Sequence, residues 1–347
     1  MILSSSILAI SSFLISTFLT YKLINFSKLL NLIDTPNKRS SHKTPTSKGG
    51  GIPIVLLTFI AIIFLYCDKT IDTTFGISLI LGSTIISITG FLDDLYNLSV
   101  IRRIILYSLS IFIAIILLAP ETNIVIGSTK IEMSVFVYLV YAVYIFWLLN
   151  LFNFMDGTDG YAGIQTISTA FFTWLVLSNT IETNEHLILL VILASTLGFL
   201  TWNWSPAKIF MGDVGSCTLG FIFALFSVYT SSQGYLSISV WLILLSPFIG
   251  DASFTLIKKI LNGEKWYQAH NNHAYQKLYQ IGFNHRVIAK GLLVINLICI
   301  WPLAYTAVEH PDIELYVLLI CYCFIALIWS YIFHYHNKRK NVVIKNS

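Results

Sequence analysis

Three short segments of this chain carry aspartates beside glycine and asparagine. Asp93 and Asp94 follow the apolar run ISITGFL, Asp156 and Asp159 lie in NLFNFMDGTDG, and Asp213 lies between two glycines in FMGDVGS. Mg²⁺ prefers one or two carboxylates together with substrate phosphates and retained waters, so these segments are typical of a site that handles phosphate. We therefore expect a metal-assisted reaction at a phosphate group, with Mg²⁺ as the ion and Mn²⁺ as its substitute.

The spacing within NLFNFMDGTDG adds two amide side chains to the carboxylates. Asn150, Asn153 and Asp156 are three residues apart, which places them on one face of a helix. Asp159 extends the row. Helix caps use the same residue types, so each segment taken alone also has a purely structural explanation. Four oxygen-bearing side chains in one row exceed what capping requires, and we interpret them as ligand-binding residues.

Basic residues and histidines gather in two other segments. Lys48 ends a stretch with Arg39, His42 and Lys43 and precedes three glycines at an expected helix start, an arrangement that can bind an anion. Membrane topology alone explains these charges better. In AHNNHAYQKL, His270 and His273 can donate to phosphate oxygens or exchange protons near neutral pH. Zn²⁺ is disfavoured because no further Cys or His clusters with them.

Apolar segments long enough to cross a membrane must position these residues. Of the 347 residues, 56% are hydrophobic and 11% are charged, and the mean hydropathy is +0.76. Soluble domains have about 45–50% apolar and about 25% charged residues. Apolar segments occur near residues 3–23, 52–67, 72–92, 102–120, 133–152, 161–178, 186–202, 214–231, 236–257, 288–308 and 314–335. Since a span needs about 20 apolar residues, the sequence predicts an all-α polytopic transmembrane bundle of about eleven helices in a single domain, residues 1–347.

The distribution of lysine and arginine predicts which ends of these helices face the cytoplasm. With the N-terminus outside, all but Lys69 and Lys130 of the 21 basic residues fall on the cytoplasmic side. No basic stretch precedes the first helix, which we expect to be retained rather than cleaved. The C-terminus is then cytoplasmic, and the cytoplasmic loops are expected near residues 24–51, 93–101, 153–160, 203–213 and 258–287. The aspartate clusters and both histidines lie in or beside these loops.

Other classes of function receive less support. No loop interleaves aromatic and basic residues as nucleic-acid-binding proteins do, and the net charge of +4 follows from the asymmetry of the loops. A transporter would place acids near the membrane midplane, in paired halves with broken helices. A prenyltransferase would need a second aspartate-rich element of the DxxxD type. A membrane scaffold leaves the clustering of the acids unexplained.

From DTPNKRSSH near residue 34 to HNNHAYQKL near residue 278, the chain resembles the polyprenyl-phosphate N-acetylhexosamine-1-phosphate transferases, of the glycosyltransferase family 4 type. Three matching signatures are FLDDLYNLSV, NLFNFMDGTDG and NWSPAKIFMGDVGS, and the fourth is Asp251 followed by Lys258, Gly263 and the paired histidines. The resemblance implies a bacterial inner-membrane enzyme with a cytoplasmic active site. Such an enzyme transfers a sugar-1-phosphate from a UDP-sugar to undecaprenyl phosphate and releases UMP.

The resemblance also implies roles for individual residues. Asp93 and Asp94 match the acid pair held near the lipid phosphate, and Asp213 with Asn153 matches the metal position. Residues that match the contacts to the nucleotide, the pyrophosphate and the sugar diphosphate are Asn150, Asp156, Asp159, Asn203, His270 and His273. Expected partners are undecaprenyl phosphate, a UDP-N-acetylhexosamine and membrane lipids, with no nucleic acid and with a homodimer left open.

The HAYQ stretch is similar to the subgroup that initiates O-antigen synthesis, and a peptidoglycan-type phospho-MurNAc-pentapeptide transferase is the alternative. Asn97 stands where the peptidoglycan enzymes carry a lysine, and Asn271 and Asn272 replace a basic residue between the histidines. We expect Arg102, Arg103 or Lys48 to supply the missing charge. A lipid phosphate with a second pKa of about 6 is mostly dianionic at neutral pH. We therefore expect Asp94 or Asp93 to position it for direct attack, without a phospho-aspartate.

Overall fold

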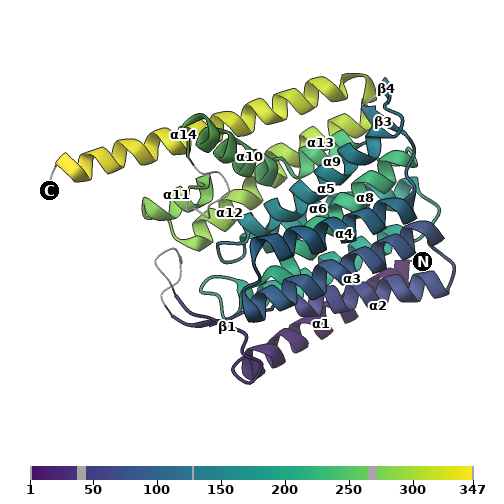
Figure 1. The fold of residues 1–347 in the computed structure, drawn as a ribbon, viewed down its shortest axis with the longest axis horizontal. Coiled ribbons are helices and arrows are strands. Elements are labelled where there is room, and N and C mark those ends of the chain that lie inside the picture. The colour runs from purple at the N-terminus through teal and green to yellow at the C-terminus, as the bar shows by residue number, and fades with distance from the viewer. Residues whose placement is uncertain (1, 37–43, 127–128, 265–271, 346–347) are drawn as a thin grey trace.

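The protein is a bundle of helices that lie roughly side by side along the long axis of the molecule (Figure 1). The computed structural model describes residues 2–36, 44–126, 129–264 and 272–345. The first seven helices are α1 (Ile2–Phe26), α2 (Ile52–Cys67), α3 (Thr73–Tyr96), α4 (Val100–Leu118), α5 (Phe136–Met155), α6 (Tyr161–Thr180) and α7 (Glu185–Asn203). The others are α8 (Asp213–Ser232), α9 (Ile238–Leu244), α10 (Ser246–Leu261), α11 (Ala274–Gln280), α12 (His285–Ile295), α13 (Trp301–Glu309) and α14 (Glu314–Lys345).

Short non-α elements interrupt the bundle. The antiparallel pair β1 (Ile33–Asp34) and β2 (Thr46–Ser47) precedes α2, and a second antiparallel pair, β3 (Asn123–Ile126) and β4 (Thr129–Glu132), joins α4 to α5. A π-helical turn, Asn296–Ile300, links α12 to α13, and a 3₁₀ turn, Pro311–Ile313, precedes α14. The all-α expectation is therefore confirmed for the body of the molecule, with two small hairpins added to it.

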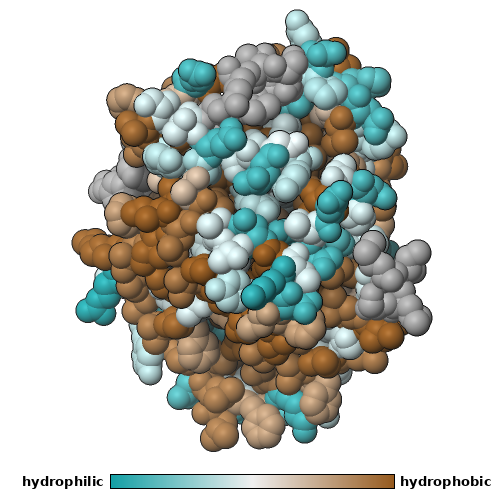
Figure 2. All heavy atoms as spheres, turned by 90° about the vertical axis from the view of Figure 1, so that its right-hand side faces the viewer, coloured by the Kyte–Doolittle hydropathy of each residue, from teal (hydrophilic) through white to brown (hydrophobic). Residues whose placement is uncertain are grey.

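Eight of the described helices are long and apolar enough to cross a membrane, and the bent pair α9 and α10 would make a ninth. The next candidate, α2, is an apolar helix of 16 residues. Viewed along the helices, apolar side chains cover the flanks of the molecule, while hydrophilic ones gather over its end face (Figure 2). The chain is thus a polytopic membrane protein. The count of eleven and the sidedness of the termini stay predictions.

Helix α8 forms the centre of the bundle. Every residue from Val214 to Ser231 is buried, and the helix packs against α3 and α5. Aromatic rings from Phe221, Phe223 and Phe226 fill the space around it with no measurable exposure. Since α8 begins at Asp213, the most enclosed helix of the protein starts at one of the expected ligand residues.

The segment expected as one span near residues 236–257 is broken. Helix α9 ends at Leu244, α10 begins at Ser246, and the two axes differ by 78°. Pro247 in the first turn of α10 has no N–H to continue the hydrogen bonding of α9. The freed carbonyl of Leu244 accepts a 2.8 Å hydrogen bond from Nε2 of Gln165. Unpaired backbone groups are costly in a membrane, so this side chain stabilises the break.

Candidate active site

The turn between α3 and α4 brings a carboxylate and a guanidinium together. Asn97 adopts a left-handed conformation (φ 50°) at the end of α3, and Ser99 caps the start of α4. Oδ1 of Asp93 accepts the Leu98 N–H at 2.6 Å, and Oδ2 lies 3.0 Å from Nη1 of Arg103. The acid pair therefore lies inside the last turn of α3, which continues to Tyr96. The loop expected near residues 93–101 is correspondingly shorter.

Asp94 points in a different direction from Asp93, toward the N-terminus of α8. Its Oδ2 accepts the Val214 N–H at 3.2 Å, and Oδ1 lies 3.7 Å from Nζ of Lys48. Gly212 precedes α8 with φ +78°, and a Cβ there would lie 2.6 Å from Oδ2 of Asp94. Only glycine combines this backbone angle with this close approach. The positive end of the α8 dipole also favours a carboxylate here.

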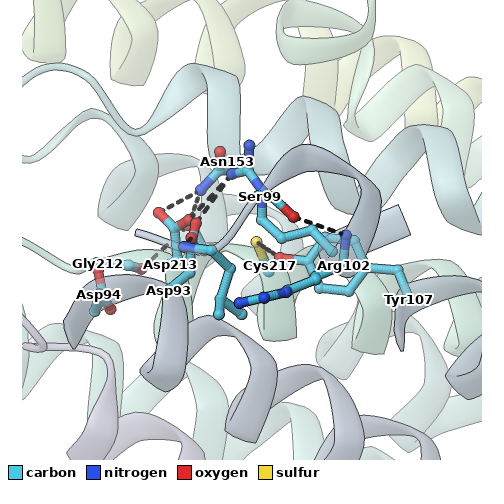
Figure 3. Close-up of polar contacts among 12 residues, drawn as sticks. Asp93, Asp94, Ser99, Arg102, Tyr107, Asn153, Gly212, Asp213 and Cys217 are labelled. Carbon is cyan, nitrogen blue, oxygen red and sulfur yellow. Dashed lines mark hydrogen bonds and ion pairs between the residues drawn. The ribbon is translucent and has the colours of Figure 1, made fainter. Parts of the chain in front are cut away.

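Asp213, the first residue of α8, lies beside the end of α5. Nδ2 of Asn153 donates to its Oδ1 at 2.7 Å and to Oγ of Ser216 at 3.2 Å. Nη1 of Arg103 is 3.8 Å from Oδ2 of Asp213. Figure 3 shows Asp93, Asn153 and Asp213 converging, with Asp94 next to Gly212. Arg103 thus connects the two carboxylates Asp93 and Asp213.

Asp156 completes this group from the end of α5. Its carboxylate accepts the Gly212 N–H, and Asp213 and Asp94 lie close enough to repel its negative charge. Burial, followed by these neighbouring carboxylates, raises the pKa of Asp156 well above its usual range. Several carboxylates therefore surround one helix N-terminus, and Lys48 and Arg103 are their basic neighbours among the described residues. The negative charges outnumber the positive ones, so the group can bind an additional cation.

The donor set fits Mg²⁺ with its hydration shell better than a fully protein-bound metal. Among the described residues, no three His, Cys, Asp or Glu side chains come close enough together to hold an ion by themselves. Mg²⁺ usually takes one or two carboxylates and completes its octahedron with waters and substrate phosphates. Asp213 is the best placed of these carboxylates, because its side chain keeps 26% of its surface exposed while Asn153 orients it.

Other residues expected to bind substrate lie outside this contact network. Nδ2 of Asn150 bonds to the carbonyl of Phe146 in its own helix at 2.7 Å. Asn203 joins two loops, accepting the Gly160 N–H at 2.8 Å and donating to the Ile209 carbonyl at 2.8 Å. The helical row through Asn150 and Asn153 does not extend to Asp159, because α5 ends at Met155.

Asp159 instead forms a buried pair with a histidine far away in sequence. Its Oδ1 lies 3.1 Å from Nδ1 of His285, and its Oδ2 accepts the Ala207 N–H at 3.2 Å. Burial acts to raise the pKa of Asp159, but the hydrogen bond and charge of His285 and the Ala207 amide outweigh it, so the pKa lies below its usual value. This carboxylate therefore joins the loop before α6 to the loop before α8 and to the start of α12.

The glycine segment after Lys48 is engaged in backbone pairing. Gly50 N–H donates to the Phe210 carbonyl and Gly51 N–H to the Met211 carbonyl, both at 2.8 Å. These two amides are therefore not free to bind an anion, which agrees with the preference for membrane topology as the explanation of the neighbouring charges. The pairing instead places Lys48 beside Asp94. Arg39, His42, Lys43 and His270 lie outside the described residues.

His273 is described and lies at the start of α11, buried against Tyr275 and Phe154. Ser216, Tyr275 and His285 were not identified from the sequence as partners of the site residues. His285 is 126 residues from Asp159, and no local spacing signals a contact over such a distance. Ser216 and Tyr275 stood inside the noted motifs NWSPAKIFMGDVGS and HAYQ but were not singled out there.

The sequence matches a known family of glycosyl transferases. A model of glycosyl transferase family 4 matches residues 76–231. A probable undecaprenyl-phosphate N-acetylglucosaminyl 1-phosphate transferase of Bacillus subtilis is 30% identical over 279 residues, which cover 78% of this chain and 75% of that protein. A phospho-N-acetylmuramoyl-pentapeptide-transferase of Thermotoga petrophila is 33% identical over 205 residues, or 56% of this chain and 64% of that protein.

A third relative, a decaprenyl-phosphate N-acetylglucosaminephosphotransferase of Mycobacterium leprae, is 33% identical over 129 residues, or 33% of this chain and 30% of that protein. The family match spans the aspartates at the ends of α3, α5 and α8. The resemblance seen in the sequence is thereby confirmed. This chain belongs to glycosyl transferase family 4, and it is an enzyme of the polyprenyl-phosphate hexosamine-1-phosphate transferase type.

Proposed function

We propose that this protein transfers an N-acetylhexosamine-1-phosphate from a UDP-sugar to undecaprenyl phosphate and releases UMP. The observation that carries the proposal is the group of Asp93, Asp94 and Asp213 at neighbouring helix ends, with Arg103 between two of them and Lys48 beside the third. The family supports it, since the Bacillus subtilis relative is named for undecaprenyl phosphate and N-acetylglucosaminyl 1-phosphate.

The reaction forms one phosphorus–oxygen bond and breaks another. A phosphate oxygen of the lipid attacks the sugar-linked phosphorus of the UDP-sugar, and the bond from that phosphorus to the bridging oxygen breaks, with the electron pair leaving on UMP. A phosphate monoester is mostly dianionic at neutral pH, so the attack requires little proton removal. Asp94, held by the Val214 amide and Lys48, orients the nucleophile or accepts a residual proton.

In this proposal Asp213 and Asn153 would hold the Mg²⁺ ion. The ion would neutralise negative charge on the pyrophosphate and on the departing UMP. Arg103 places its guanidinium between Asp93 and Asp213, where it stabilises the same negative charge. Positioning and electrostatic stabilisation account for most of the catalysis of phosphoryl transfer, so these fixed charges suit the reaction.

An apolar groove between α4 and α5 supports a lipid acceptor. Its volume is about 770 Å³, and its lining includes Ile111, Phe112, Ile115 and Leu139. Arg103 lies on the same helix, about three turns from the middle of this lining. A long isoprenoid chain could lie along the groove while its phosphate reaches the carboxylates. We place this chemistry on the cytoplasmic side of a bacterial inner membrane, in agreement with the positive-inside rule.

The decisive experiment is an assay of purified protein in nanodiscs with undecaprenyl phosphate, Mg²⁺ and a panel of UDP-N-acetylhexosamines. We expect UMP release that depends on the lipid. Asp94→Ala and Asp213→Ala should abolish turnover while the folded protein remains in the membrane, and Asp312→Asn, at an exposed carboxylate, should retain activity. Absence of lipid-dependent UMP release with every sugar would overturn the proposal.

The Thermotoga relative favours a second donor, UDP-MurNAc-pentapeptide, because it is named a phospho-N-acetylmuramoyl-pentapeptide-transferase. Adding this donor to the panel separates the two functions. We favour the simple N-acetylhexosamine, since the HAYQ stretch of this chain is similar to the subgroup that initiates O-antigen synthesis. The protein would then perform the first membrane step of a cell-envelope polysaccharide.

A further inference from the structure

A buried carboxylate outside the catalytic group caps a short helix. Asp251 on α10 is 5% exposed. Its Oδ1 accepts the Ala274 N–H at 2.7 Å and the hydroxyl of Thr255 at 3.2 Å, and its Oδ2 accepts the Tyr275 N–H at 3.3 Å. Ala274 and Tyr275 are the first two residues of α11. One side chain from another helix thus satisfies two of the N–H groups that a helix start leaves unpaired.

The residue before this cap is His273. Its Nδ1 lies 3.8 Å from Oδ1 of Asp251, and its side chain is 6% exposed. The imidazole stacks against the rings of Tyr275 and Phe154, with centroid distances of 5.9 and 6.4 Å. Gln276 accepts the His273 N–H at 3.1 Å. The position of His273 therefore follows from the position of the α11 N-terminus.

Tyr275 connects α11 to the end of α5. Its hydroxyl donates to the Phe154 carbonyl at 2.9 Å, and Phe154 is the residue after Asn153. A Cβ at Gly157 would lie 2.2 Å from the Tyr275 oxygen, so the chain needs glycine where this ring passes. Burial raises the pKa of Tyr275 well above its usual range. The hydroxyl group accordingly stays protonated and can donate the hydrogen bond to the Phe154 carbonyl.

From these contacts we propose that Asp251 is a positioning residue for the sugar-nucleotide side of the active site. By capping α11, it fixes His273 and Tyr275 against Phe154, beside the Asn153–Asp213 pair. This inference rests on the proposed function, and it assigns Asp251 to donor binding and not to the acceptor or to the metal. None of the described contacts of Asp251 reaches Asp93, Asp94 or Asp213.

Asp251→Asn tests this role, because it keeps the size of the side chain but removes its charge and one of its two acceptor oxygens. Ser253→Ala is the matched control. Ser253 lies two residues further along α10, and its hydroxyl accepts from Nε1 of Trp147 at 3.2 Å. Each variant loses one polar contact of α10, but only Asp251→Asn disturbs α11. Asp251→Glu tests rescue, since it restores the charge and both oxygens.

Two readouts are measured in nanodiscs: steady-state kinetics and amide hydrogen exchange. We expect Asp251→Asn to raise the KM for the UDP-sugar about tenfold, because loss of the cap destabilises the helix start that positions His273 and Tyr275. The KM for undecaprenyl phosphate should be unchanged, and kcat should fall much less. Exchange should accelerate across residues 274–280. Ser253→Ala should match the wild type in both readouts, and Asp251→Glu should recover part of the donor affinity.

A purely structural cap predicts a different result. In that case exchange accelerates and thermal stability falls, but the KM for the UDP-sugar equals that of Ser253→Ala, and the positioning role is overturned. Unchanged exchange in Asp251→Asn would overturn the capping itself. Failure of the proposed function is seen separately, as absence of UMP release from the wild-type protein, and it does not affect the exchange measurement.

Discussion

The side-chain amide of Asn153 donates a 2.7 Å hydrogen bond to Oδ1 of Asp213 and so joins the end of α5 to the first residue of α8. The same amide also donates to Ser216. A ligand carboxylate that is oriented by a neighbour binds its metal more tightly than a free one, and loss of such a neighbour typically costs about 10–100-fold in metal affinity or activity.

We therefore expect Asn153→Ala to shift the Mg²⁺ concentration for half-maximal UMP release upward by about 10–100-fold. Titration of Mg²⁺ after removal of bound ions with EDTA measures this shift. Ser216→Ala is the control, because it removes a partner of Asn153 but leaves the bond to Asp213 in place. Identical Mg²⁺ dependence in Asn153→Ala and the wild type would exclude Asn153 from the metal site.

Two adjacent arginines on α4 provide a matched pair. Nη1 of Arg103 contacts Asp93 at 3.0 Å and lies 3.8 Å from Asp213, while Arg102 is exposed. Removing a charge that is fixed at the reacting phosphates costs about a hundredfold in kcat. Arg103→Gln should show this loss, and Arg102→Gln should stay near the wild-type rate, although both lose one positive charge. Equal losses would indicate a general effect of charge at the membrane surface.

The sequence was sufficient to predict the all-α class and to predict that the aspartate clusters lie at the same end of the helices. Apolar length predicted most of the spans, since a helix that crosses a membrane needs about 20 apolar residues. It did not predict the 78° break between α9 and α10, because a span of ordinary apolar length conceals it. Pro247 was the local signal, but its effect depends on Gln165, which lies 79 residues before the Leu244 carbonyl that it stabilises.

The site shows a similar division between local and distant information. Asp93, Asp94 and Asp213 were recognisable from neighbouring glycines and from the family signatures. The separate directions of Asp93 and Asp94 were not, since adjacent residues on a helix point about 100° apart and only the fold decides what each one meets. The helical row does not extend to Asp159, because α5 ends at Met155, and the end of a helix is the least certain feature that a sequence pattern predicts.

The raised pKa of Asp156 predicts a conflict between stability and function. Burial and the carboxylates of Asp213 and Asp94 cause the shift. A carboxyl group whose folded pKa exceeds its unfolded value stabilises the fold below the unfolded pKa and loses that contribution as pH rises through the folded pKa. Without Mg²⁺, Asp156→Asn should therefore raise the melting temperature relative to the wild type at alkaline pH, by a few degrees per 1–2 kcal/mol.

This difference should shrink toward acidic pH and on addition of Mg²⁺, which neutralises the repulsion in the wild-type protein. Both effects are measured by thermal unfolding in detergent, monitored by intrinsic fluorescence across pH 5–9 with EDTA or Mg²⁺. A shift of one pKa unit between the unfolded and folded protein corresponds to about 1.4 kcal/mol of stability. A melting temperature of Asp156→Asn below that of the wild type at every pH would show that the ionised carboxylate is stabilising in the fold.

The pair of Asp159 and His285 makes the opposite prediction. Although burial opposes it, the hydrogen bond and charge of His285 and the Ala207 amide lower the pKa of Asp159. A carboxylate with a depressed folded pKa stabilises the fold above its unfolded pKa of about 3.9, and this contribution is lost as pH falls through the folded pKa. Asp159→Asn should thus lower the melting temperature at pH 6–7 by a few degrees, the effect of losing a charged hydrogen bond of about 1.5–3 kcal/mol.

The gap between Asp159→Asn and the wild type should close as the pH falls below about 4, since the wild-type carboxylate then becomes protonated as well. Asp68→Asn is the control, because Asp68 is exposed at the end of α2, and its melting curve should follow the wild type throughout. A gap for Asp159→Asn that stays constant down to pH 3 would mean that the side chain contributes through packing or neutral hydrogen bonds, and that its charge has no part in fixing the loops at residues 157–160 and 204–207.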